Sequence, residues 1–189
     1  TFRLVWDSPK DGDSIMAIME AIATTYLEAD AASVTFSGIP ATYEHLEIRL
    51  LARTNRTYYI DPINIAINTD STSSNFTVAI MQANGTSKSA YSSPTSRFMT
   101  YVVGNLDTGG TIKAEDYGPM TMTFFDYANA SKNTTLQYMS GTPNTTQHIY
   151  FGAVTWDNTA AVVSLIFTPL NGTAFMRGTE CTLYGIKSS

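Results

Sequence analysis

Short runs in which apolar and polar side chains alternate recur from about residue 33 to the C-terminus of this chain. Successive side chains of an extended strand point to opposite faces, so this alternation is typical of a strand with one buried face and one solvated face. Around Ile48, for example, the apolar side chains of Leu46 and Leu50 face the same way. The charged Glu47 and Arg49 face the opposite way. Roughly ten such runs are found, at residues 33–37, 45–51, 63–68, 76–81, 98–103, 120–125, 135–139, 149–156, 162–167 and 179–186.

Turn-forming pairs separate these runs, namely Asp61-Pro62, Asn84-Gly85, Gly109-Gly110 and Asn171-Gly172. Roughly ten short strands at this spacing predict an antiparallel β-sandwich of jelly-roll-like type. The composition agrees, because Thr, Tyr and Phe favour strands while Ser and Asn favour turns. A chain of 189 residues can build one core. We therefore expect a single all-β domain over residues 25–189, with the Ser-, Thr- and Asn-rich residues 68–75 and 85–96 forming loops.

The first 24 residues differ from the rest. After the turn at residues 11–14, four apolar side chains are spaced as on one stripe of a helix: Ile15, Ile18, Met19 and Ile22. This spacing predicts a short amphipathic helix over residues 14–24, which packs either on its own domain or on a neighbouring subunit. Residues 24–27 also fit the start of a strand, and both interpretations stay open.

The charge pattern excludes several partners. The net charge is −5 and the pI is near 4.8, and no cluster of Lys and Arg is present, so we expect no binding to the phosphate backbone of nucleic acids. Charged residues make up 14% of the chain against a usual ~25%, a deficit typical of surfaces covered by other subunits. No apolar stretch approaches the ~20 residues of a membrane span, and we expect no signal peptide.

The sequence offers no recognisable catalytic or metal-binding constellation. His45 and His148 are the two histidines, and we interpret both as surface residues without a nucleophile beside them. The acidic pair Glu115-Asp116 would point to opposite faces of a strand. Asp11 and Asp13 are the other candidate acids for glycoside hydrolysis. We therefore expect no enzymatic activity and no bound cofactor or metal.

Asp70 and Cys181 are two further residues that could carry a function, and neither is a strong candidate. Asp70 lies among Asn68, Ser71 and Ser73, but one carboxylate is too few for a Ca²⁺ site, so a solvated loop is the better interpretation. Cys181 is the single cysteine and lies in a strand-like run. It cannot form an internal disulfide, and we expect it to be buried.

Two segments carry a resemblance to a known family. They are residues 33–46 (SVTFSGIPATYEHL) and residues 175–187 (FMRGTECTLYGIK). Together with residues 65–68, 75–76 and 156–162, they resemble a group of small virion proteins of tailed phages, common in aquatic and cyanobacterial phages. The resemblance spans about residues 25–187, and the chain departs from the usual pattern in its longer N-terminal segment.

The resemblance implies a jelly-roll-like building block of the phage particle, with no catalytic residues to transfer. It implies a capsid decoration (cement) protein, a homotrimer whose partners are further copies of itself and the major capsid protein or a tail protein. A tail fibre or tail-tip module that binds a host surface glycan is the alternative, and a glycosidase on a β scaffold is a third hypothesis. The candidate interface residues are Ile15, Ile18, Met19, Ile22, Tyr58, Tyr59, Tyr91 and Tyr101.

Overall fold

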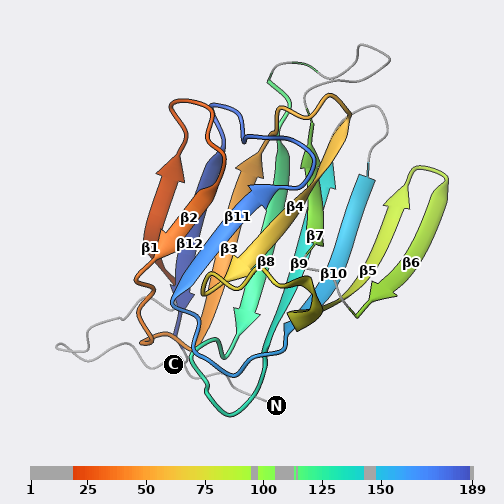
Figure 1. Ribbon diagram of the computed structural model, residues 1–189. Helices are drawn as coiled ribbons and strands as arrows, with labels where there is room; N and C mark the ends of the chain where they lie inside the picture. The colour runs from red at the N-terminus through yellow and green to blue at the C-terminus, as the bar shows by residue number, and fades with distance from the viewer. Residues whose placement is uncertain (1–18, 95–97, 105–112, 114, 143–147, 188–189) are drawn as a thin grey trace, which may run out of the picture.

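The chain folds as an antiparallel β-sandwich of two sheets, seen in a computed structural model that describes residues 19–94, 98–104, 113, 115–142 and 148–187 (Figure 1). The larger sheet has eight strands in the order β1-β12-β3-β8-β9-β10-β5-β6. The smaller sheet has four strands in the order β2-β11-β4-β7 and lies in front of the larger one in Figure 1. The predicted all-β sandwich is confirmed. In the described ranges, no helix has the length and apolar character needed to cross a membrane.

The strands of the larger sheet are β1 (Met19–Tyr26), β12 (Glu180–Ile186), β3 (His45–Ala52), β8 (Gly118–Phe125), β9 (Thr134–Thr142), β10 (His148–Trp156), β5 (Phe76–Asn84) and β6 (Ser87–Ser93). Those of the smaller sheet are β2 (Val34–Ser37), β11 (Ser164–Pro169), β4 (Ile60–Ile67) and β7 (Phe98–Val103). A single 3-10 turn, η1 (Ser73–Asn75), is the helical segment in the described part of the chain.

The core lies between the two sheets and follows the alternation in the sequence. In β9, for example, Leu136 and Tyr138 are buried while Gln137 and Met139 are exposed. Each fully buried large apolar side chain contributes about 1.5–3 kcal/mol relative to an exposed one. The largest of them belong to both sheets or to the loops joining them, and include Trp156, Tyr127, Phe76, Phe124, Phe167 and Phe175.

The N-terminal segment corrects one prediction. Residues 19–24 are not helical: they belong to β1, which pairs antiparallel with β12 at one edge of the larger sheet. Met19 and Ile22 therefore lie on a strand, and Ile22 packs against the core. The helical spacing was misleading because β1 contains a register shift between Ala21 and Ala23, which breaks the strict period of two. Ile15 and Ile18 lie outside the described residues.

Two segments expected to be turn or loop are strands. Residues 87–93 form β6, which pairs with β5 across the predicted Asn84-Gly85 turn. Gly85 has the positive φ of 53° that such a turn requires. β6 is polar and exposed because the smaller sheet does not extend over this edge strand (Figure 1). Asp61-Pro62, expected to form a turn, lies within β4, where both residues are buried.

Candidate functional site

The face of the larger sheet that points away from the smaller sheet is the candidate functional surface, called here the outer face. Four neighbouring strands of this sheet, β8, β9, β10 and β5, present no charged side chain to solvent on this face. The outward residues are Pro119, Thr121, Thr123 and Phe125 on β8, and Thr135, Gln137, Met139 and Gly141 on β9. On β10 they are Ile149, Phe151, Ala153 and Thr155, and on β5 they are Thr77, Ala79, Met81 and Ala83. A solvated sheet face normally carries charges, so this composition is unusual.

An apolar patch occupies the middle of the outer face and consists of Met81, Met139, Ile149 and Phe151. Phe151 pairs with Met81 on one side and with Met139 on the other, so these three lie in one transverse row. Ile149 lies in the next row along β10. Ile149, Met81 and Met139 are each more than half exposed, at 60%, 58% and 57%. Contiguous exposed side chains of this kind on a soluble domain are typical of an interaction surface.

The apolar patch is flanked by shallow hollows rather than by a deep cleft. A hollow of about 510 Å³ lies over β5, β6 and β10 and is lined by Met81, Ala90 and Phe151. A second, of about 240 Å³, lies over Pro119, Gly141 and Ile149. Their walls are mostly apolar, so they fit apolar side chains of a partner better than a polar substrate.

The outer face becomes polar toward β3 and β12. Arg49 forms an ion pair of 2.8 Å with Glu47, and its guanidinium lies 5.0 Å from the centre of the Tyr184 ring. The hydrogen bond and the charge of Glu47 raise the pKa of Arg49. A depression of about 360 Å³ here, called the polar pocket, is lined by Arg49, Leu50, Leu51, Pro119, Met120, Thr121, Glu180, Thr182 and Tyr184.

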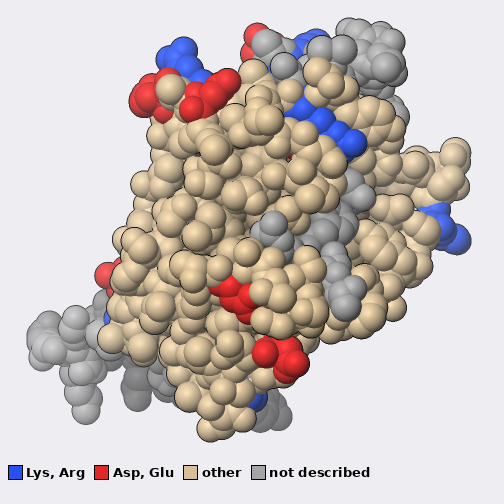
Figure 2. Space-filling model, viewed as in Figure 1, with Lys and Arg blue, Asp and Glu red and all other residues tan. Residues whose placement is uncertain are grey.

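The opposite side of the molecule is also poor in charge. Figure 2 views the sandwich from the side of the smaller sheet, where Lys, Arg, Asp and Glu are few and scattered. The low charge content of the chain is therefore not confined to one surface.

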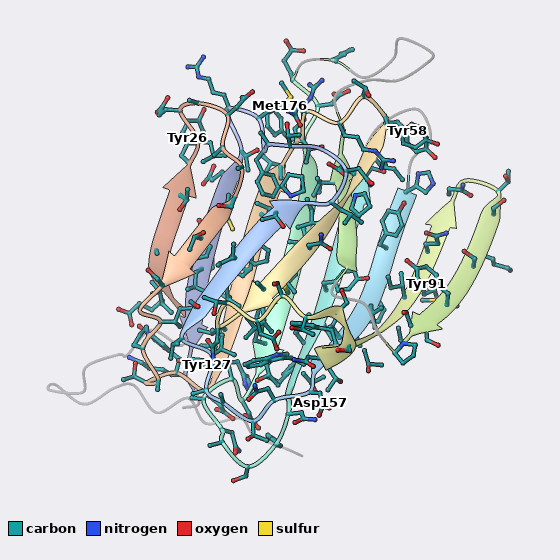
Figure 3. The ribbon with its side chains drawn as sticks, viewed as in Figure 1. Tyr26, Tyr58, Tyr91, Tyr127, Asp157 and Met176 are labelled. Atoms are coloured by element: carbon teal, nitrogen blue, oxygen red, sulfur yellow. The ribbon has the colours of Figure 1, made fainter. Side chains whose placement is uncertain are left out.

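The tyrosines predicted to form an interface do not gather at one place (Figure 3). Tyr58 precedes β4 and is 41% exposed, whereas Tyr91 lies on the edge strand β6 and is 40% exposed. Tyr59 is half-buried, with its ring centre 4.3 Å from that of Tyr58. Tyr101 belongs to β7, but its side chain lies outside the described residues. Tyr91 pairs with the inward-facing Ile80, so its side chain lies on the face of the sheet opposite the apolar patch.

His148 is buried, which corrects its interpretation as a surface residue. Its ring is stacked between those of Tyr59 and Tyr150, with centres 5.8 and 5.7 Å away. Burial lowers the pKa of His148, and its Nδ1 atom has no hydrogen-bond partner in the described part of the chain. The arrangement holds a neutral imidazole and supports packing rather than acid–base chemistry.

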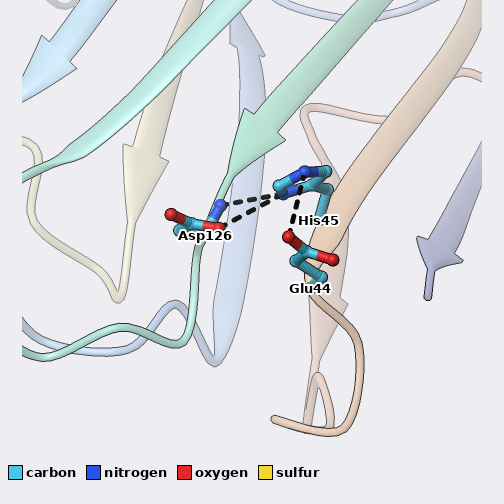
Figure 4. A group of neighbouring side chains, drawn as sticks. All are labelled: Glu44, His45 and Asp126. Atoms are coloured by element: carbon cyan, nitrogen blue, oxygen red, sulfur yellow. Dashed lines mark hydrogen bonds and ion pairs between the residues drawn. The ribbon is translucent and has the colours of Figure 1, made fainter. Parts of the chain in front are cut away.

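Glu44, His45 and Asp126 form a cluster where β3 begins and β8 ends, and the cluster has the residue types of a metal site (Figure 4). Its geometry does not suit one ion. The Nδ1 atom of His45 accepts a hydrogen bond of 3.0 Å from the backbone N–H of Asp126, so the neutral ring carries its proton on Nε2. The Glu44 carboxylate lies 3.8 Å from that nitrogen. Asp126 is further held by an ion pair with Lys132, which lowers the pKa of its carboxyl.

Asp70 is a structural hydrogen-bond acceptor rather than a cation ligand. Its carboxylate accepts hydrogen bonds from Trp156, Asn75 and the backbone N–H of Thr72. Burial alone would raise the pKa of Asp70, but these hydrogen bonds outweigh it and lower the pKa to about 2. The acids proposed for hydrolysis give no pair: Glu115 is exposed, Asp116 caps the backbone N–H of Lys113, and Asp11 and Asp13 lie outside the described residues.

Sequence reasoning missed the apolar patch. The signal was present, because apolar residues occupy both faces of the runs around Ile149, Phe151 and Met81 instead of one face. The pattern was interpreted only as evidence for strands. When both faces of a strand are apolar, the sequence does not tell which face the second sheet covers. Here the smaller sheet covers the other face, and the patch is left exposed.

Comparison with known proteins gives no family for this chain. No protein family matches the sequence, and no curated protein matches it. The crystal structure of galectin LEC-6 from Caenorhabditis elegans is similar with a TM-score of 0.33 and 11% sequence identity, over 87% of this chain and 96% of that chain. A likeness this weak carries no argument about what this chain binds.

Proposed function

We propose that this protein is a structural component of a phage particle and acts as a capsid decoration protein without catalytic activity. One observation carries the proposal: the outer face of the larger sheet is broad, uncharged at its centre and apolar. Such a surface suits permanent contact between subunits, because interface centres are depleted of charge and enriched in aromatic residues and Met. The phage context comes from the resemblance of residues 33–46 and 175–187 to virion proteins.

The shape of the outer face supports assembly over small-molecule binding. Its hollows are shallow and spread over several strands, whereas ligand sites are concave and enclose most of the ligand. A decoration protein gains its hold from many weak contacts repeated by the symmetry of the shell. The resemblance further implies a homotrimer on the capsid surface, in contact with the major capsid protein.

The polar pocket favours a second candidate function, a tail module that binds a host glycan. Tyr184 offers a ring on which a sugar can stack, and Arg49 and Thr121 offer polar groups beside it. A glycan array with the purified protein tests this function. Binding that is lost in Tyr184→Ala and retained in Tyr91→Ala would support it, and no binding would exclude it for the sugars on the array.

Addition of the protein to particles that lack it tests the capsid role. We expect the wild type to bind heads in many copies and Phe151→Glu to bind weakly, because a carboxylate would be buried in the apolar contact between subunits. Val163→Glu is the matched control, since Val163 is 50% exposed outside the larger sheet. Wild-type protein found at the tail in a few copies would contradict the proposal.

A further inference from the structure

Two opposite charges lie in one transverse row on the outer face, at equal strand distance from β9. On one side of the row, register pairs join Lys88 of β6 to Ala83, Ala83 to Ile149, and Ile149 to Gly141 of β9. On the other side, Pro119 of β8 pairs with Leu51, and Leu51 pairs with Glu180 of β12. Pro119 and Gly141 line the same hollow and so join the two halves. The row therefore carries a cation on the edge strand β6 and an anion on β12, and Tyr26 of β1 lies beyond the anion.

The two charges are placed symmetrically about β9. On one side of β9 follow β10, β5 and β6, and on the other side follow β8, β3 and β12. The strands that carry the two charges, β6 and β12, are therefore each the third strand from β9. A two-fold axis along β9 would place the outer faces of two copies against each other, with β6 of one copy over β12 of its partner. An isologous contact of this kind requires a self-complementary surface.

We propose that the outer face binds a second copy of this chain about a two-fold axis along β9, with Lys88 of each copy paired to Glu180 of the other. This inference rests on the proposed function, because it names the partner of the surface on which that function depends. It differs from the homotrimer that the resemblance implies.

The charges of the outer face fit this arrangement. Lys88 and Glu180 have no ion-pair partner among the residues that the structure describes. In the neighbouring rows, the two-fold axis brings Arg49 opposite Met81 and Glu47 opposite Ala79, since each pair lies in one row at equal strand distance from β9. No like charges therefore meet across the contact, and such meetings are costly in a desolvated interface.

The shape of the outer face also fits the two-fold arrangement. Ile149 is the most exposed member of the apolar patch, and it lies on β10, which the two-fold axis sets over β8 of the second copy. The hollow of about 240 Å³ beside Pro119 lies there, where Gly141 of β9 contributes no side chain. Ile149 of each copy thus faces the hollow of the other, and Met139 of β9 faces its own counterpart.

The size of the face is sufficient for a stable contact. With about 4.8 Å between neighbouring strands, β6 and β12 lie roughly 29 Å apart. Strands of eight or nine residues, such as β8 and β9, are roughly 25 Å long. A surface of these dimensions approaches the ~800 Å² that each partner buries in a standard interface.

Charge exchange tests the pairing. Sedimentation of the full chain across a dilution series should give a dimer for the wild type. Lys88→Glu and Glu180→Lys should each weaken the dimer by about tenfold or more, because two ion pairs per dimer become like-charge contacts. The double variant Lys88→Glu/Glu180→Lys should restore it. Lys132→Glu, at the Asp126 cluster and outside the row, is the control for charge and should leave the dimer unchanged.

The possible results separate this inference from the proposed function. A monomer or a trimer at every concentration, or a double variant that fails to recover the dimer, would overturn the two-fold contact. Binding to heads is measured separately on the same variants. A dimer that does not bind heads would overturn the proposed function alone, and head binding by a wild-type monomer would overturn the inference alone. Circular dichroism and thermal melting check that each variant is folded.

Discussion

The indole Nε1 of Trp156 donates a hydrogen bond of 2.9 Å to the Asp70 carboxylate. Trp156 ends β10 in the larger sheet, whereas Asp70 follows β4 of the smaller sheet. The same carboxylate receives a hydrogen bond of 2.8 Å from Asn75, and the backbone N–H of Asp157 donates to the backbone carbonyl of Asn75. This carboxylate therefore ties the loop between β4 and β5 to the end of the core strand β10.

Stability should fall in acid because of Asp70. Its pKa is about 2 when folded and near the ordinary 3.8 when unfolded, so the unfolded chain takes up the proton first. The contribution is complete above about pH 4 and is lost as the pH falls toward about 2. We expect Asp70→Asn to lower the free energy of unfolding by at most about 2 kcal/mol at neutral pH, discounted for partial exposure. The deficit should shrink in acid, as urea titrations at several pH values can measure. Asp157→Asn, at an exposed site, is the control.

His148 should add a second, milder pH dependence. Burial lowers the pKa of His148 in the folded protein below the ordinary value of 6.5. At a pH between these two pKa values, the unfolded chain binds a proton on this imidazole and the folded chain does not. Stability is therefore complete above about pH 6.5 and declines as the pH falls below it. His148→Phe keeps a ring between Tyr59 and Tyr150 and should flatten this part of the profile. An unchanged slope in the variant would assign the effect to other groups.

Gly185→Ala should destabilise the sandwich by about 1–3 kcal/mol. Gly185 faces inward on β12, and a methyl group there would overlap the ring of Tyr43. Gly141→Ala is the matched control, because the nearest atom to a Cβ at Gly141 is a backbone oxygen 3.8 Å away. Chemical denaturation of both variants measures the difference, and equal losses would contradict the steric explanation.

Cys181 should resist thiol reagents in the folded protein. It is fully buried in β12, and burial raises the pKa of its thiol to about 12, so almost no thiolate forms at neutral pH. We expect labelling by a disulfide reagent to be slow in buffer and rapid in denaturant. Fast labelling of folded protein would mean that β12 opens readily. Its burial confirms the prediction from the sequence.

Much of the fold followed from local pattern. The alternation in β3, β8 and β9 identified these strands, and in β3 it placed Leu46 and Leu50 on one face with Glu47 and Arg49 on the other, as observed. Local pattern failed at β1 and β6. Both are edge strands, exposed for most of their length, so neither carries the regular burial that produces a clear alternation.

The sequence by itself determined that this chain is an all-β sandwich, because the period of its apolar residues depends only on the geometry of an extended strand. The tertiary structure alone decided which face of each strand is covered. Ile149 and Tyr150 are both apolar in character, yet Tyr150 is buried under the smaller sheet and Ile149 is exposed on the outer face. The difference arises because burial is settled by packing between segments far apart in the chain, and it is this packing that leaves the candidate surface open.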